Sequence, residues 1–305
     1  MKIKVNRLKN NPIIFPEMDQ SLGNNINGPS LICVPKWISN PLGFYYLYFA
    51  AHNGSYIRLA YADDLEGPWH IYKSGSLQLV ESFFPTELSP QISKYANKYY
   101  NKPHIASPDV HIHEESHEIY MYYHGLQLNL LQMTRVARSK DGIYFVAEPE
   151  IISPSYLRVF NYDGWYYGMS MPGILFRSPN GINNFERGAS LFNHKMRHSA
   201  LRVDKDILQI FWTQVGDCPE RILLSIVDLT EDWSDWKAST PIEVLFPEKE
   251  WEGGYLPPES SVRGPINESV CQLRDPAIYE EEGRIFMLYS IAGESGIAIA
   301  ELKIN

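Results

Sequence analysis

Three residues of the chain are suited to proton transfer, and each stands at the start of an apolar segment. Asp109 lies in SPDV, His198 in RHSAL and Asp275 in RDPA. Carboxyl and imidazole groups exchange protons near neutral pH when a protein tunes their pKa, and the ordinary pKa of histidine is about 6.5. These three are the predicted catalytic residues, with acid and base left unassigned between them. As structural alternatives, each aspartate could cap a turn and the histidine could bond to backbone.

Three arginines occupy matching places at the starts of such segments, namely Arg158, Arg197 and Arg274. If these segments converge, the three cations converge as well, and an unpaired buried charge costs several kcal/mol. Compensation could come from acidic side chains at the same level, Glu220 among them, or from a ligand that carries a carboxylate or a phosphate. Arginine binds such groups in a bidentate manner. The three arginines are therefore predicted to bind substrate.

A further polar set follows aromatic stretches. His52 in FAAHN and His124 in YYHG hold the same position in two segments, while Gln214 lies in WTQVGD and Glu294 in AGES. With Asn27, which begins NGPSLI, they are predicted to contact the substrate, although the histidines could equally cap hairpins. The run HIHEESH at 111–117 resembles a metal-binding cluster, but alternate residues of a strand point in opposite directions, so no metal site is predicted there.

One unit that recurs five times must position these residues. An apolar strand, a turn, an aromatic-rich strand, a third strand and a charged turn follow one another, with Gly, Asn, Asp or Pro at the turns, as in Asp163-Gly164 and Glu282-Gly283. Blades that pack radially bury both of their faces. The sequence therefore predicts one all-β domain over 1–305, a five-bladed β-propeller with antiparallel blades of about four strands. The predicted blades are 27–73, 104–148, 154–190, 196–240 and 271–305, with long insertions at 74–103 and 240–270, and Ile13 to Phe15 are expected to add the outer strand of the last blade.

Composition narrows the class of protein. The net charge of −9 and pI of about 5.5 argue against a nucleic-acid partner. No stretch approaches the roughly 20 apolar residues that span a bilayer, and the first residues lack the apolar core of a signal peptide. Three cysteines without C-x-x-C spacing favour neither disulfides nor zinc. We therefore predict a cytoplasmic location and no membrane partner.

The blade openings resemble a known family. SPDVHI followed by EIYMYYHG, and RDPAIYEEEGRIFMLYS, are similar to the openings in five-bladed propeller glycosidases of the arabinanase and fructosidase type, glycoside hydrolase families 43, 62, 117 and 32. The strings NGPSLI, RHSAL and AGESGIAIAEL also resemble an uncharacterised bacterial subgroup. The family 43 resemblance implies an inverting mechanism, with a basic Asp in the first blade, a pKa-tuning Asp near the second and an acidic Glu in the third.

The family pattern transfers only in part. Asp109 matches the tuning aspartate, but Gly28-Pro29 replaces the basic Asp-Pro, and Ser155 to Arg158 replace the segment of the acidic Glu. Asp275 and His198 are the predicted substitutes, with Asp19 as a weaker candidate, and the resemblance to family 117 implies that a histidine can donate the proton. Asp109, His198 and Asp275 are accordingly expected to share one hollow.

These observations predict a glycoside hydrolase-like protein that acts on a short or terminal sugar by an inverting-type acid/base mechanism. Two alternatives stay open: a non-catalytic carbohydrate-binding propeller, and a phosphate-using sugar-processing enzyme, which would explain the arginines. The expected partner is a carbohydrate, and the arginines allow an anionic one. No cofactor is required, and the resemblance leaves room for an axial Ca²⁺.

Overall fold

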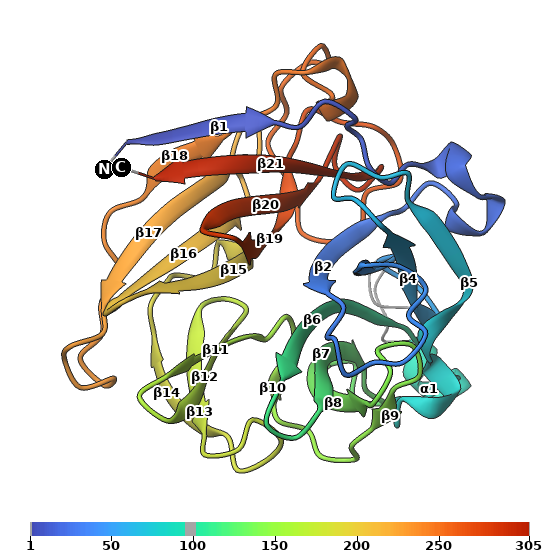
Figure 1. Cartoon of the computed structure of the whole chain (residues 1–305), viewed down its shortest axis with the longest axis vertical. Helices are drawn as coiled ribbons and strands as arrows, with labels where there is room; N and C mark the ends of the chain where they lie inside the picture. The colour runs from blue at the N-terminus through green and yellow to red at the C-terminus, as the bar shows by residue number, and fades with distance from the viewer. Residues whose placement is uncertain (1, 95–101, 305) are drawn as a thin grey trace.

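The computed structural model describes residues 2–94 and 102–304, in which the strands form five antiparallel sheets around a central axis. This arrangement confirms the predicted five-bladed β-propeller (Figure 1). From the axis outward, the first blade contains β2 (Asn27–Cys33), β3 (Tyr45–Ala50), β4 (Tyr56–Ala62) and β5 (His70–Gln78). The second contains β6 (Ile105–His113), β7 (Glu118–Leu126), β8 (Gln132–Ser139) and the two short strands β9 (Val146–Ala147) and β10 (Ser153–Pro154).

The remaining blades follow the same order. The third contains β11 (Arg158–Tyr162), β12 (Trp165–Ser170), β13 (Ile174–Ser178) and β14 (Glu186–Ser190). The fourth contains β15 (Met196–Asp204), β16 (Ile207–Gln214), β17 (Ile222–Asp228) and β18 (Ile242–Leu245), so its outer strand lies inside the segment that we interpreted as an insertion. The fifth contains β19 (Arg274–Glu281), β20 (Arg284–Ser290), β21 (Ile297–Ile304) and β1 (Ile3–Arg7).

Alternation along the strands explains why the blades stack. In β3, Tyr46 and Tyr48 pack into one apolar cluster, whereas Leu47 and Phe49 pack into another on the opposite face of the sheet. Both faces of a blade are thus buried against its neighbours, as the twofold period of a strand requires. The turns Asp163-Gly164 and Glu282-Gly283 have positive φ at both residues, which matches the twist of a two-residue hairpin.

The strand that closes the ring differs from the prediction. β1 pairs with β21 from Ile3 opposite Ile304 to Arg7 opposite Ala300, which brings the two ends of the chain side by side (Figure 1). The expected segment at 13–15 contributes only an isolated bridge between Ile14 and Ile297. It cannot extend along β21 because the edge of that strand is already occupied by residues 3–7.

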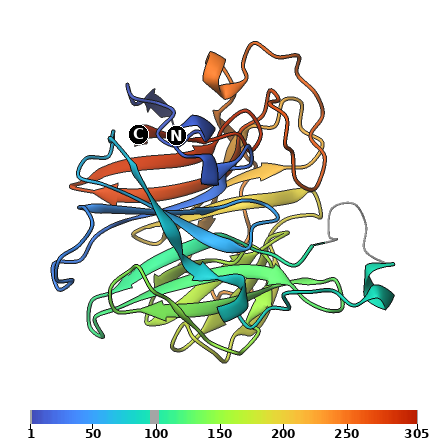
Figure 2. The same cartoon turned by 90° about the vertical axis from the view of Figure 1, so that its right-hand side faces the viewer.

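Helices are few and short in the described part of the chain. They are α1 (Pro90–Ser93) and the 3-10 turns η1 (Pro16–Met18), η2 (Gln20–Leu22), η3 (Leu79–Glu81) and η4 (Glu250–Glu252). None of the helices in residues 2–94 and 102–304 has the length and hydrophobicity to cross a membrane. In Figure 2 the connection with α1 and the long orange connection before β19 extend to the same side of the propeller.

A distortion at the start of the inner strands positions the site. Pairing of the inner strand with its neighbour shifts register between Asn27 and Ser30, and equivalent shifts occur in β6, β15 and β19. Gly28, Ser107, Tyr156 and Asp275 adopt left-handed φ at or just before the starts of four inner strands. Such bulges redirect side chains and are common near active sites. Here they direct side chains toward one end of the axis.

Candidate functional site

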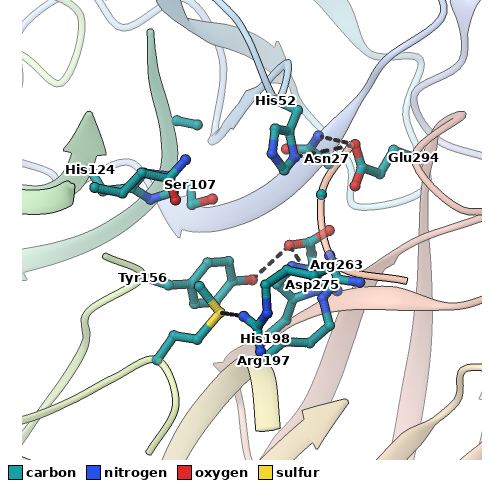
Figure 3. Close-up of a pocket in the computed structure, with 14 residues that line it drawn as sticks. Asn27, His52, Ser107, His124, Tyr156, Arg197, His198, Arg263, Asp275 and Glu294 are labelled. Carbon is teal, nitrogen blue, oxygen red and sulfur yellow. Dashed lines mark hydrogen bonds and ion pairs between the residues drawn. The ribbon is translucent and has the colours of Figure 1, made fainter. Parts of the chain in front are cut away.

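A hollow of about 480 Å³, part of it open to solvent, lies at the axial end where the inner strands begin (Figure 3). All five blades contribute to its wall, which consists of Asn27, His52, Ala106, Ser107, His124, Gln132, Tyr156, Met171, Arg197, His198, Arg263, Gly264, Asp275 and Glu294.

The hollow gathers most of the predicted site residues but not all. Two of the three predicted catalytic residues, His198 and Asp275, line it together with five predicted substrate-binding residues: Asn27, His52, His124, Arg197 and Glu294. Asp109, Arg158, Gln214 and Arg274 are absent from its wall. The expectation that Asp109 shares the hollow with the other two is therefore wrong for the side chains as they lie in this structure.

Asp275 is the buried carboxyl group at the centre of the site. Its Oδ1 accepts a hydrogen bond of 2.9 Å from the Tyr156 hydroxyl and lies 3.4 Å from His198 Nδ1. Its Oδ2 is buried without a hydrogen-bond partner among the described residues. Burial, together with the negative charge of Glu294, raises the pKa of Asp275 to about 6. This carboxyl group can therefore hold or release a proton near neutral pH.

His198 is uncharged in this environment. Burial, followed by the positive charges of Arg197 and Arg274, lowers its pKa well below the ordinary value. The backbone N–H of Asp275 points at His198 Nδ1 from 3.4 Å, which makes Nδ1 an acceptor. The ring proton then resides on Nε2, because in a neutral imidazole one nitrogen donates and the other accepts.

Glu294 is the second carboxyl group in the wall, and its surroundings favour the charged form. It accepts hydrogen bonds from Arg274 Nη1 at 2.8 Å, Asn25 Nδ2 at 2.8 Å and Asn27 Nδ2 at 3.1 Å, and His52 Nδ1 lies 3.6 Å away. Burial by itself would raise its pKa, but the interactions with His52, Arg274 and Asn25 outweigh burial and lower the pKa to about 2. The site thus places an ionised carboxylate near one that titrates close to neutrality.

Arg274, behind this wall, and Arg197, within it, belong to one buried ion network. Arg274 Nε lies 3.2 Å from Glu220 Oε2 and Arg197 Nη1 lies 3.4 Å from the same oxygen. Arg197 also donates to the carbonyl oxygen of Val262 at 3.0 Å. Since Arg274 is fully buried, it acts on the site through Glu220 and Glu294 rather than by contact with a ligand.

Asp109 lies below the hollow because of the bulge in β6. The bulge presents Ser107 to the hollow, and Asp109, two residues further along, instead accepts hydrogen bonds from His111 Nε2 and the backbone N–H of Val159, both at 2.8 Å. Arg158 fills the space between, with its guanidinium 4.1 Å from the centroid of the Tyr156 ring. Burial alone would raise the pKa of Asp109, but His111 and Arg158 lower it.

The other predicted residue outside the wall is Gln214, at the end of β16. Its carbonyl oxygen accepts a hydrogen bond from the Ser261 hydroxyl at 3.1 Å, so the residue supports the loop that runs over the site. Its side chain is not part of the hollow.

Sequence reasoning missed four polar wall residues: Ser107, Gln132, Tyr156 and Arg263. Ser107 and Tyr156 could have been found, because they stand at the same blade-start position as Asp275. Arg263 lies in a long segment without periodicity, and no pattern marks it. Gln132 donates to His104 Nε2 at 3.1 Å and orients this buried imidazole, whose pKa is lowered to about 4 by burial.

In the part of the chain that the structure describes, no three His, Cys, Asp or Glu side chains come together as a metal-binding set. The imidazoles nearest to such a set are His52, His104 and His124, with ring centroids 6.5 Å and 6.1 Å apart in succession. The axial Ca²⁺ therefore stays a prediction.

Solved structures that are similar to this fold include glycoside hydrolases. A glycosyl hydrolase from Bacteroides ovatus superposes with a TM-score of 0.66 at 11% identity, over 98% of this chain and 93% of its own. A family 43 β-xylosidase/α-arabinofuranosidase from a compost microbial metagenome, solved with xylotriose in a calcium-free form, gives 0.62 at 11% identity, over 100% and 96%. At such identities the similarity establishes the fold, which confirms the propeller resemblance read from the blade openings. No protein-family model matches the chain.

A closer relative exists among curated proteins. An uncharacterized protein of Acanthamoeba polyphaga mimivirus is 35% identical over 331 aligned positions, which cover 99% of this chain and 90% of the relative. The chain belongs to the same family as this mimivirus protein.

Proposed function

We propose that the protein is a glycoside hydrolase that cleaves a short or terminal sugar by an inverting acid/base mechanism centred on Asp275. The observation that carries the proposal is the pair of carboxyl groups in one hollow, Asp275 with a pKa of about 6 and Glu294 with a pKa of about 2. Environments that separate two carboxyl pKa values are typical of acid/base sites. Support at the level of the fold comes from glycoside hydrolase structures, one of which was solved with xylotriose.

In this mechanism Asp275 is the general acid. Its Oδ1 is held by Tyr156, while Oδ2 has no partner among the described residues and is free to carry the proton to the glycosidic oxygen. A raised pKa is what a carboxylic acid needs in order to hold its proton until the bond breaks. Neutral His198, with its proton on Nε2, supplies a hydrogen-bond donor beside the acid without adding charge.

His52 is the proposed general base, oriented by Glu294. With Nδ1 directed to the ionised carboxylate 3.6 Å away, Nε2 is left to accept a proton from water. Pairing of one ring nitrogen with a carboxylate selects the tautomer and leaves the other nitrogen as the acceptor. The His52 side chain is 21% exposed, so water reaches it. Figure 3 shows His52 and Glu294 on one side of the hollow and Asp275 with Tyr156 on another.

The closed base of the hollow favours a ligand that places one sugar residue inside it. Tyr156 and Arg158 are stacked at its base, and the buried Arg274 network closes one wall. A ligand therefore enters from the end that is open to solvent and stops at the level of Tyr156. Such a closed end suits removal of a terminal residue or cleavage of a short saccharide.

The test is turnover of a panel of 4-nitrophenyl glycosides and oligosaccharides, with and without inorganic phosphate, by the wild-type protein and by Asp275→Asn and His52→Ala. On the substrate that is cleaved, we expect each variant to lose at least about a hundredfold in kcat, the usual contribution of a positioned acid or base. Asp235→Asn, at an exposed position on a turn, is the matched control and should behave as wild type. Proton NMR should show that the first product to form has the anomeric configuration opposite to that of the substrate.

The melting temperature of Asp275→Asn shows whether this variant is folded. Because the folded protein raises the pKa of Asp275, the ionised group destabilises the native state above pH 6, and the effect disappears below the ordinary pKa of about 4. The variant should therefore melt at or above the wild-type temperature at pH 8. Sugar binding without any turnover would support the carbohydrate-binding alternative, and turnover only with phosphate would support the phosphate-using enzyme. Full activity in Asp275→Asn would remove this residue from the mechanism.

A further inference from the structure

Arg263 brings to the hollow a guanidinium group to which the described part of the chain supplies no carboxylate within ion-pair distance. Its Nη2 donates to the carbonyl oxygen of His194 at 2.8 Å, and its Nη1 lies 3.2 Å from the sulfur of Met171. Among residues 2–94 and 102–304 it forms no ion pair within 4.0 Å, and the sequence of 95–101, YANKYYN, contains no Asp or Glu. The planar donors of a guanidinium group match the two oxygens of a carboxylate or phosphate, so Arg263 is suited to bind an anionic ligand.

A second guanidinium lines the same wall with incomplete neutralisation. Arg197 is 2% exposed, shares its one acidic partner, Glu220 Oε2, with Arg274, and has a buried Nε without a hydrogen-bond partner among the described residues. Figure 3 shows Arg197 and Arg263 on the same side of the hollow, next to His198 and Asp275. Two cations therefore face the place where the ligand would meet the proposed acid.

When Asp275 is protonated, the charged groups around the hollow sum to one positive charge. With Asp275 protonated, the three guanidinium groups of Arg197, Arg263 and Arg274 stand against the two carboxylates Glu220 and Glu294. Arg158 and Asp109, below the hollow, offset each other. This local excess contrasts with the net charge of −9 of the whole chain. One unmatched cation is the complement of one carboxylate rather than of a phosphate dianion.

We propose that the sugar is a uronic acid, whose carboxylate is bound by Arg263 and Arg197 beside the reacting bond. The inference rests on the proposed function for the cleavage step, but the binding step stands on the two arginines alone. Arg263 is then the specificity-determining residue, since it forms no ion pair among the described residues, whereas Arg197, the other guanidinium of the wall, already pairs with Glu220. The aromatic ring of Tyr156 and the sulfur of Met171 offer the sugar ring apolar contact.

The first experiment measures binding of free sugars, which a hydrolase cannot cleave, by titration calorimetry on the wild-type protein. Glucuronate and galacturonate are compared with glucose, galactose and xylose, and glucose 6-phosphate is included as a phosphate-bearing arm. We expect a uronate to bind about tenfold or more tightly than its neutral counterpart, as a charge-assisted bidentate contact provides. The preference should fall to less than about threefold in Arg263→Gln and persist in Arg187→Gln, an exposed arginine on the outer strand β14.

The outcomes separate this inference from the proposed function. Cleavage of neutral aryl glycosides with no advantage for aryl uronides, together with no uronate preference in binding, would overturn the inference and leave the hydrolase intact. Uronate-selective binding that depends on Arg263, without turnover of any glycoside, would support the inference and end the hydrolase proposal. Tighter binding of glucose 6-phosphate than of either uronate would overturn the assignment to a carboxylate, as would a uronate preference that survives in Arg263→Gln.

Discussion

At the scale of single residues, the site is shaped by which residue occupies the left-handed position near the start of four of the five inner strands. Gly28, Ser107, Tyr156 and Asp275 hold that conformation in four blades. The family 43 resemblance implies acidic residues in the first and third blades, whereas this chain has Gly28 and Tyr156 there and a carboxyl group in the fifth. Because the blades repeat around an axis, the side chains of Ser107, Tyr156 and Asp275 reach the same hollow from three different blades. In the proposed mechanism, a residue of the fifth blade can therefore take the role of the acid that the resemblance places in the third blade.

Tyr156 provides a prediction at this scale through its hydrogen bond to Asp275. Burial raises the pKa of Asp275 to about 6, and donation by the Tyr156 hydroxyl opposes that rise by stabilising the carboxylate. In Tyr156→Phe the pKa of Asp275 should increase further, so activity that needs the protonated acid should persist to higher pH. In a profile of kcat/KM against pH, we expect the alkaline limb, near pH 6 in the wild type, to move up by about one unit.

The control for this variant is Tyr255→Phe, because Tyr255 is 68% exposed and lies outside the hollow. Its profile should superpose on that of the wild type. An alkaline limb that does not move in Tyr156→Phe, or moves to lower pH, would contradict the assignment of Asp275 as the acid.

At the scale of elements, β1 is held in place by its pairing with β21 and by an ion pair between Arg7 and Glu252. Glu252, in η4, is fully buried and accepts hydrogen bonds from Arg7 Nε at 2.7 Å and from the Tyr289 hydroxyl at 2.9 Å. The backbone N–H groups of Glu248 and Lys249 donate to the same carboxylate. The pair therefore connects the first strand, the long connection before β19 and the fifth blade.

Removal of the Arg7 charge should destabilise the protein strongly. Arg7→Leu leaves the Glu252 carboxylate buried without a cation, and broken buried pairs cost about 3–5 kcal/mol of the free energy of unfolding. Denaturant titration followed by Trp fluorescence measures the loss, and the double variant Arg7→Leu/Glu252→Gln should recover part of it because the unpaired charge is gone. Arg284→Leu, which breaks the exposed pair with Glu301, should cost less than about 1 kcal/mol. Equal losses for the two arginines would show that burial of the pair is unimportant.

At the scale of the whole molecule, the hollow exists only while the ring is closed. Its wall draws on residues from Asn27 to Glu294, so no single blade contains a complete set of groups. The contacts between neighbouring inner strands, such as β2 with β6 and β15 with β19, hold the blade starts at the distances described above. Opening the ring at β1 should therefore disturb a site to which β1 itself contributes nothing.

A chain that begins at Leu8, and so lacks β1, tests this coupling. It should unfold at a lower temperature than a chain that begins at Ile3, and it should bind sugar more weakly although every wall residue is present. The edge of β21 loses its partner and becomes available for pairing with another molecule, so size-exclusion chromatography should show association. Wild-type melting and binding in the shorter chain would mean that blade packing alone maintains the ring.

The sequence by itself determined the number of blades, the hairpins and the blade starts that carry chemistry, because alternation and turn residues such as Asp163-Gly164 act over a few neighbours. It also indicated His198, Asp275, Glu294 and His52 as polar residues that could converge. Only the tertiary structure decided that Ser107 rather than Asp109 reaches the hollow, since a bulge changes which side chains of a strand face the axis. It likewise decided that residues 3–7 close the ring and that Arg263, from a segment without periodicity, joins the site. Those outcomes depend on contacts between residues far apart in the chain, which no local pattern encodes.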